Sequence, residues 1–252
     1  MSSHSVSIGI LSQLVQYIRF LGIDEHRLFA SVGLDPAVLD NPDEQIPFDK
    51  YIALENNAAK LSGDPCFGLH MGEFITPGHY NIIGYMMMNS RNLGQPLMKL
   101  GKYNRLIGTV ISGKVQPGFQ KARLFLNVPK NAPDLSRHCT ECAASSIISL
   151  ARRLCGKQIN PLAVSFSFPP PGDDAEYTRV FQAPVRFGEK HTVLEMDHSI
   201  GAFQTVQPNP RLLEYFERYA QEYIAKLEEY GPLSKKVVKL FLAKSDQRNL
   251  SI

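Results

Sequence analysis

The sequence predicts an α+β fold in which a mostly helical N-terminal subdomain packs on a small antiparallel sheet with helices on one face. Over the first hundred residues, apolar side chains recur at spacings of three and four, which is typical of amphipathic helices. From residue 109 onward, stretches rich in β-branched residues and polar–apolar alternation indicate strands. We expect a helical subdomain over 1–107, an α+β subdomain over 108–230 and a linker helix within 231–252.

The helices of the first subdomain are marked by capping residues as well as by periodicity. Gly22 is placed to end the first helix, and Asp24 to cap the next. Pro36 fits the first position of a short turn, and Pro47 breaks the chain before the following helix. The expected helices cover residues 7–21, 24–32, 48–61, 67–73, 80–88 and 93–107.

The second subdomain begins with a predicted hairpin. Residues 109–115 and 121–127 read as strands, and Pro117-Gly118 between them supplies turn chemistry. A long helix then ends at Gly156. The remaining expected elements are strands over 162–168, 185–187 and 192–196, and helices from 173 or 174 to 181, over 209–230 and over 233–244.

Composition excludes several classes of protein. The 252 residues are 44% hydrophobic and 20% charged, which is ordinary for a globular chain, and the net charge of +3 is too small and too scattered for a nucleic-acid-binding surface. Nothing about the four cysteines indicates a secreted chain held together by disulfides. Gln13, Gln16 and Arg19 interrupt the apolar N-terminal run, which therefore indicates neither a signal peptide nor a membrane span. We expect a cytoplasmic protein without membrane contact.

No motif indicates an enzyme. The sequence has no glycine-rich phosphate loop, nucleophile elbow or metalloprotease helix, and its paired carboxylates occupy expected cap or solvent-facing positions. We therefore predict no catalytic residues and no cofactor. A small-molecule enzyme with an unrecognised site is an alternative, and it requires titratable residues that converge in a cleft.

The sharpest chemical cluster is His138, Cys139 and Cys142 on the long predicted helix. This spacing is compatible with a metal- or redox-responsive sensor, since a helix N-terminus lowers a thiol pKa. A structural zinc site, however, needs four ligands, and no second Cys or His pair accompanies this one. The other interpretation makes the two cysteines small core residues. We predict no metal site and keep the sensor as an alternative.

An ordered series of short motifs is similar to a known family. It comprises Gly33-Leu34-Asp35, Gly63-Asp64-Pro65, Phe67-Gly68-Leu69, Gly84-Tyr85 and Pro184 to Gly188. Together they resemble the N-terminal effector and dimerisation domain of AraC-type transcriptional regulators, in the mostly helical arabinose-binding-like branch rather than the cupin branch. The resemblance covers roughly residues 20–230, and most of these glycines and prolines are expected to be structural.

The resemblance implies a small-molecule effector, a homodimer and DNA binding through a C-terminal helix-turn-helix region. Asn249 to Ile252 look like the entry to that region, so the sequence as given is expected to lack it and to contact DNA only through it. Effector binding would then change the DNA binding of the whole regulator. The identity of the effector does not follow from the sequence.

Two sets of residues are candidates for these roles. We place an effector pocket between the helical subdomain and the sheet, lined by Tyr51, Tyr85, Met86, Tyr103 and Arg105. The helix over 209–230 carries an apolar stripe at three- and four-residue spacing, which fits either a dimer interface or packing on its own domain. The candidate interface residues are Leu212, Phe216, Tyr219 and Tyr223.

Overall fold

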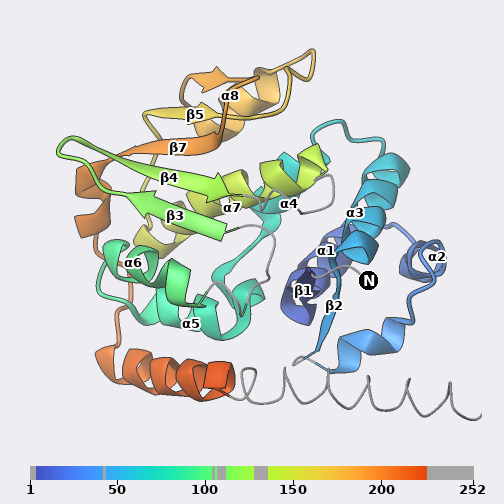
Figure 1. Ribbon diagram of the computed structural model, residues 1–252, viewed down its shortest axis with the longest axis horizontal. Helices are drawn as coiled ribbons and strands as arrows, with labels where there is room; N and C mark the ends of the chain where they lie inside the picture. The colour runs from blue at the N-terminus through green and yellow to red at the C-terminus, as the bar shows by residue number, and fades with distance from the viewer. Residues whose placement is uncertain (1–3, 42–43, 104–105, 107–111, 128–135, 226–252) are drawn as a thin grey trace, which may run out of the picture.

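The α+β class is confirmed by a computed structural model, which describes residues 4–41, 44–103, 106, 112–127 and 136–225. Figure 1 shows the N-terminal helices on one side of the molecule, the sheet with α7 behind it on the other, and a C-terminal helix running below α5. The expected helix over 233–244, and the linker over 231–252 that contains it, lie outside the described residues.

The N-terminal half is helical, as predicted. The Asp24 side chain accepts hydrogen bonds from the backbone N–H groups of His26 and Arg27, which confirms it as a cap. Gly22 follows the first helix in the left-handed region, with φ of 73°. The helical elements are α1 (Ile8–Phe20), α2 (Glu25–Ala30), η1 (Pro36–Asp40), α3 (Phe48–Ser62), α4 (Phe67–Phe74), η2 (Pro77–Tyr80), α5 (Asn81–Asn89) and α6 (Gly94–Tyr103).

Sequence reasoning missed a short two-stranded ribbon. Strand β1 (Ser5–Ser7) pairs antiparallel with β2 (Gln45–Pro47), with Val6 opposite Ile46. Each strand has three residues, which is too short for a readable alternation, and the partners lie far apart in sequence. The ribbon brings the start of the chain beside the start of α3.

The second sheet has strand order β3-β4-β7-β5-β6. Its pairs are antiparallel except β5 with β6, which run parallel and are connected through α8. The expected strand over 162–168 is shorter, because its pairing ends at Ser165. The elements are β3 (Ser112–Gln116), β4 (Lys121–Asn127), α7 (Arg137–Cys155), β5 (Ala163–Ser165), α8 (Ala175–Phe181), β6 (Val185–Arg186), β7 (Thr192–Asp197) and η4 (His198–Ala202).

Helix α7 packs against both parts of the molecule. Its residues Cys139 and Cys142 belong to the apolar cluster of the N-terminal helices, whereas Ala144 and Ile148 belong to the cluster beneath the sheet. Helix α4 crosses α7 at close range through Gly68 and Gly72. Helix α7 therefore contributes to both apolar clusters, the one among the N-terminal helices and the one beneath the sheet.

The C-terminal helix, residues 210–225, packs on α5 and α6. Ala220 is fully buried and shares an apolar cluster with Ile83, Met86 and Tyr103. Within the described residues, no helix is both long enough and apolar enough to cross a membrane.

One carboxyl group is buried in the N-terminal core. Glu55 of α3 is fully buried, and its Oε1 accepts a hydrogen bond from the Tyr51 hydroxyl at 3.5 Å, while Oε2 has no hydrogen-bond partner among the described residues. Burial raises the pKa of Glu55 to about 8. The folded protein therefore binds this proton at pH values where the unfolded chain has released it.

We expect Glu55→Gln to remove a pH dependence of stability. Because the folded pKa lies above the unfolded value, the wild-type protein loses stability as the pH rises from about 5 to about 8, and the neutral amide does not. Relative to wild type, the variant should gain about 3–4 kcal/mol between pH 5 and pH 8, at about 1.4 kcal/mol per pH unit. Urea denaturation at the two pH values measures it, and parallel pH profiles of the two proteins would contradict it.

Candidate functional site

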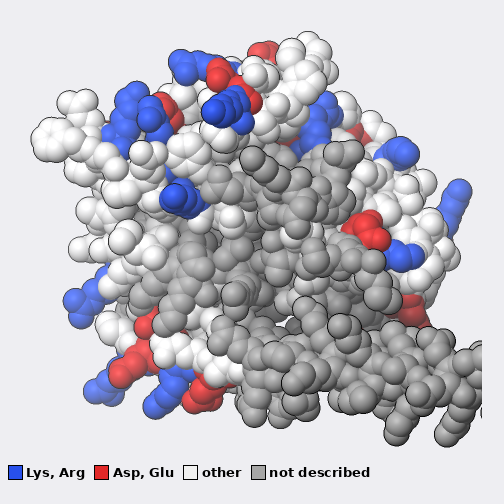
Figure 2. Space-filling model, viewed as in Figure 1, with Lys and Arg blue, Asp and Glu red and all other residues white. Residues whose placement is uncertain are grey.

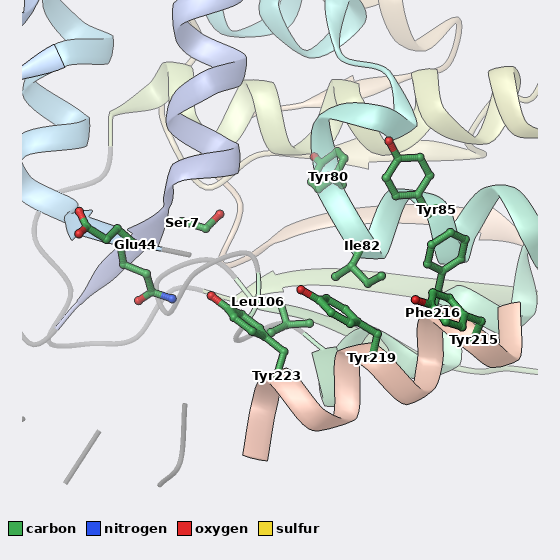
Figure 3. Close-up of a pocket in the computed structure, with 11 residues that line it drawn as sticks. Ser7, Glu44, Tyr80, Ile82, Tyr85, Leu106, Tyr215, Phe216, Tyr219 and Tyr223 are labelled. Carbon is green, nitrogen blue, oxygen red and sulfur yellow. The ribbon is translucent and has the colours of Figure 1, made fainter. Parts of the chain in front are cut away.

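A cavity of about 360 Å³ lies between α5, the C-terminal helix and the β1–β2 ribbon. Figure 3 shows Tyr219 and Tyr223 projecting from the C-terminal helix toward α5 and the ribbon, with Glu44 and Ser7 at one end and Tyr85 and Phe216 at the other. The lining residues are Ser7, Glu44, Gln45, Tyr80, Ile82, Tyr85, Leu106, Tyr215, Phe216, Tyr219 and Tyr223.

The start of the C-terminal helix is fixed to the end of α5. The backbone N–H of Asn209 donates to the carbonyl of Asn89 at 3.2 Å, and the Thr205 hydroxyl donates to the carbonyl of Ser90. The Asn209 side chain accepts from the Leu212 N–H at 3.2 Å, which suits a helix N-cap. These contacts determine which face of the helix meets α5.

Aromatic stacking closes one end of the cavity. The rings of Tyr85 and Phe216 lie 5.3 Å apart with an interplanar angle of 19°. Deeper in the wall, the hydroxyls of Tyr80 and Ser146 are 3.1 Å apart, and burial raises the pKa of Tyr80 well above its ordinary value. The Tyr80 hydroxyl is thus a neutral group held by α7.

Of the predicted effector-pocket residues, only Tyr85 lines this cavity within the described part of the chain. Met86 and Tyr103 are buried in the cluster behind its wall. Tyr51 is buried in the N-terminal core beside Phe48 and does not line the cavity. Arg105 lies outside the described residues.

The predicted interface residues divide into two groups, those that line the cavity and one that does not. Phe216, Tyr219 and Tyr223 line the cavity of their own chain, whereas Leu212 is 45% exposed and does not. Their stripe therefore serves packing on the domain, and a dimer interface on this helix stays a prediction.

Sequence reasoning missed Ser7, Glu44, Gln45, Tyr80, Ile82, Leu106 and Tyr215. The aromatic density of residues 215–223 was a usable signal for Tyr215. No local signal was available for the residues on the ribbon, because they reach the cavity through a pairing between distant segments.

A second cavity, of about 250 Å³, lies between α6, α7 and the sheet. This is where we expected the effector pocket, but none of the described candidate residues lines it. Its wall is largely apolar and includes Leu97, Leu124, Ala151, Leu154 and Met196. Arg123 at its edge is already held by Glu195 at 2.8 Å.

The cluster of His138, Cys139 and Cys142 does not converge on one point. Both thiols are buried in the N-terminal core, while the His138 Nδ1 lies 3.1 Å from Glu141. Burial raises the pKa of both thiols well above their ordinary value, which is opposite to what a reactive thiolate needs. No group of three or more His, Cys, Asp or Glu side chains in the described segments is arranged to hold a metal ion.

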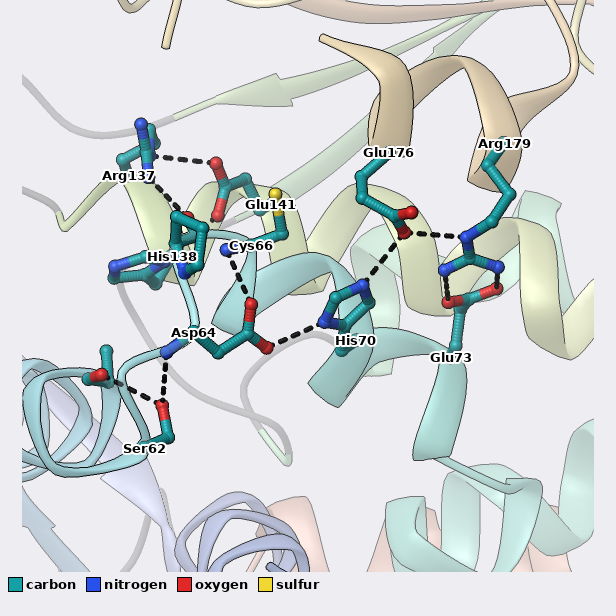
Figure 4. Close-up of polar contacts among 12 residues, drawn as sticks. Ser62, Asp64, Cys66, His70, Glu73, Arg137, His138, Glu141, Glu176 and Arg179 are labelled. Carbon is teal, nitrogen blue, oxygen red and sulfur yellow. Dashed lines mark hydrogen bonds and ion pairs between the residues drawn. The ribbon is translucent and has the colours of Figure 1, made fainter. Parts of the chain in front are cut away.

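A polar network connects α4 with α8 on the surface (Figure 4). His70 lies between Asp64, 2.6 Å from its Nδ1, and Glu176, 2.9 Å from its Nε2, and Arg179 connects Glu176 to Glu73. Partial burial lowers the pKa of His70, but the hydrogen bonds to Glu176 and Asp64 outweigh it and raise the pKa. Since both ring nitrogens are occupied, this histidine is suited to cross-linking helices rather than to base catalysis.

Among the described residues on the face in Figure 2, no basic patch stands out. On the face in Figure 2, Lys and Arg side chains are interspersed with Asp and Glu side chains. This arrangement agrees with the scattered charges of the sequence.

The known proteins to which this chain is similar are regulators of transcription. Residues 22–202 match the family described as the arabinose-binding domain of AraC transcription regulators, N-terminal. The chain is 25% identical over 241 residues to the ornithine utilization regulator of Pseudomonas aeruginosa strain PAO1, covering 95% of this chain and 70% of that protein.

A solved structure shares the fold. The transcriptional regulator CdpR from Pseudomonas aeruginosa aligns with a TM-score of 0.55 and 15% identity, over 79% of this chain and 64% of that one, so this chain spans less than two thirds of CdpR. At this identity the likeness concerns fold alone. Because the family match extends over most of the 252 residues, the chain belongs to the family of N-terminal arabinose-binding domains of AraC transcription regulators.

Proposed function

We propose that the domain senses a small molecule in the aromatic cavity beneath the C-terminal helix and thereby controls the DNA binding of an AraC-type regulator. The observation that carries this proposal is that two different segments of the chain contribute the residues that line the cavity. Ser7, Ile82 and Tyr85 belong to the N-terminal half, whereas Tyr215 to Tyr223 belong to a helix beyond residue 202, where the family match ends. A ligand there touches both.

The cavity suits control because one of its walls is the C-terminal helix, which precedes the segment that the sequence predicts to lead into the DNA-binding region. A ligand shifts the equilibrium between two arrangements only if it binds one of them more tightly. A molecule enclosed between α5 and the C-terminal helix favours the docked arrangement, which is also fixed by Asn209 and Thr205. In this role the domain binds a ligand and catalyses no reaction. The regulator would act in the cytoplasm, where it has access to DNA.

The same helix supports a proposal for homodimers. Leu212, Tyr215 and Tyr219 are each about half exposed, and aromatic residues are enriched in interfaces. Coverage of this face by a second copy would place the two effector cavities beside the dimer contact. Sedimentation of wild type and Leu212→Glu tests the dimer: the charged variant should shift toward monomer, and an unchanged mass would contradict this interface.

The effector site is tested by native mass spectrometry of the purified chain incubated with a small-molecule extract of bacterial cells. We expect wild-type protein to carry an additional small mass that denaturation releases. Tyr219→Ala removes one cavity wall and should abolish the additional mass, and because Tyr219 is 50% exposed the fold should survive.

Ala151→Leu is the matched control, since it fills the second cavity and leaves the aromatic one untouched. It should retain the additional mass. Loss of the mass in Ala151→Leu with retention in Tyr219→Ala would move the effector site to the second cavity. Absence of any released mass from wild type would contradict the sensor proposal.

A further inference from the structure

We infer that the aromatic cavity selects a small organic cation, a proposal that rests on the sensor function above and specifies its ligand class. Six of the eleven lining residues are aromatic: Tyr80, Tyr85, Tyr215, Phe216, Tyr219 and Tyr223. Among the described lining residues, Glu44 carries the one charged side chain, and there is no Lys or Arg. Aromatic rings together with a carboxylate form the kind of surface that attracts an ammonium group.

The rings surround the cavity rather than forming one flat wall. Tyr80 and Tyr85 come from η2 and α5 on one side, and Tyr219 and Tyr223 from the C-terminal helix on the other (Figure 3). The negative face of an aromatic ring attracts a cation more strongly when the cation is shielded from water. A cavity of about 360 Å³ accommodates an alkylammonium ion between the two sides.

Glu44 supplies a fixed negative charge at one end. Its Oε1 accepts a hydrogen bond from the Asn41 side chain at 3.1 Å, and no Lys or Arg of the described residues pairs with it. The carboxylate is exposed, so its attraction is screened and modest, but its sign repels anionic ligands. The rings therefore supply most of the affinity, and Glu44 contributes to the preference for positive charge.

An internal contact shows that a ring of this group already interacts with a cation. The guanidinium of Arg218 lies 5.9 Å from the centroid of the Tyr215 ring, although Arg218 does not line the cavity. The second cavity offers a contrast, because its largely apolar wall has no comparable set of rings. The two cavities thus differ in the ligand chemistry they favour.

The ligand class is tested with pairs of probes of similar size, one cationic and one neutral. Choline is compared with 3,3-dimethylbutan-1-ol, in which carbon replaces the ammonium nitrogen, and butylammonium with butan-1-ol. The chain has ten Tyr and no Trp, and five of these tyrosines line the cavity, so tyrosine emission reports occupancy directly. We expect at least one cation to bind about tenfold more tightly than its neutral partner.

Matched variants locate the effect. Tyr219→Phe keeps the ring and should keep the preference for the cation, whereas Tyr219→Leu removes one of the six rings and should reduce that preference. Glu44→Gln should weaken cation binding about threefold without changing the binding of the neutral probe. Circular dichroism and melting curves confirm that each variant is folded.

The outcomes separate this inference from the proposed function. If both neutral probes bind as tightly as their cations, or if neither cation binds, the cation class is wrong. A mass that denaturation releases from wild type but that Tyr219→Ala lacks would still support the sensor in that case. If the cation binds with the same affinity to wild type and Tyr219→Leu, the aromatic cavity is not its site.

Discussion

Gly68→Ala is expected to destabilise the protein by more than about 3 kcal/mol. A methyl group at this position would lie 2.6 Å from the Cα and 2.7 Å from the carbonyl carbon of His138, and closer still to its carbonyl oxygen. These are backbone atoms of α7, so no side chain can rotate away. Relief requires α4 and α7 to separate along the crossing that joins the two apolar clusters.

Gly72 lies one turn further along α4, and its added methyl group would meet the Cys142 carbonyl oxygen at 2.7 Å. Gly78→Ala is the matched control, because the nearest atom to its methyl group beyond the adjacent residues would be the Thr76 hydroxyl oxygen, at 3.9 Å. Urea denaturation should show large losses for Gly68→Ala and a change within about 0.5 kcal/mol for Gly78→Ala. Equal stabilities of the two variants would refute the close crossing.

The difference between these glycines illustrates what the sequence does and does not predict. Local signals placed the helices well, since Asp24, Pro47 and Gly156 act on residues next to them. The motif around Gly68 correctly suggested a structural glycine. It did not reveal that α7 is the element that approaches, because that element lies seventy residues further along the chain.

The candidate site was only partly predictable for the same reason. The sequence predicts Tyr85 as a pocket residue and Phe216, Tyr219 and Tyr223 as interface residues, and so it divides residues of one cavity between two roles. Their convergence depends on how the segment around Thr205 is held at the end of α5, and nothing in local periodicity encodes that docking. Glu44 enters the site only through the β1–β2 pairing.

Buried polar networks are a further feature that periodicity does not predict. Substitution of Glu141, which belongs to such a network, is expected to cause the second large loss of stability. This residue of α7 is fully buried, where it accepts a hydrogen bond from the Tyr177 hydroxyl and pairs with Arg137 at 2.9 Å and with His138 at 3.1 Å (Figure 4). Glu141→Leu keeps the volume but removes the acceptor. We expect a loss of about 3–5 kcal/mol, because the buried Tyr177 hydroxyl and the Arg137 charge lose their partner.

The comparison with Glu176→Leu isolates the effect of burial. Glu176 bonds His70 and Arg179, but its side chain is 40% exposed, so water replaces the lost contacts and the expected cost is below about 1 kcal/mol. Adding Tyr177→Phe to Glu141→Leu removes the stranded hydroxyl and should recover at least about 1 kcal/mol. The denaturation midpoints of these variants measure how much stability each one loses relative to wild type. If the double variant were no more stable than Glu141→Leu, the cost would arise from packing around α7 rather than from the unsatisfied hydroxyl.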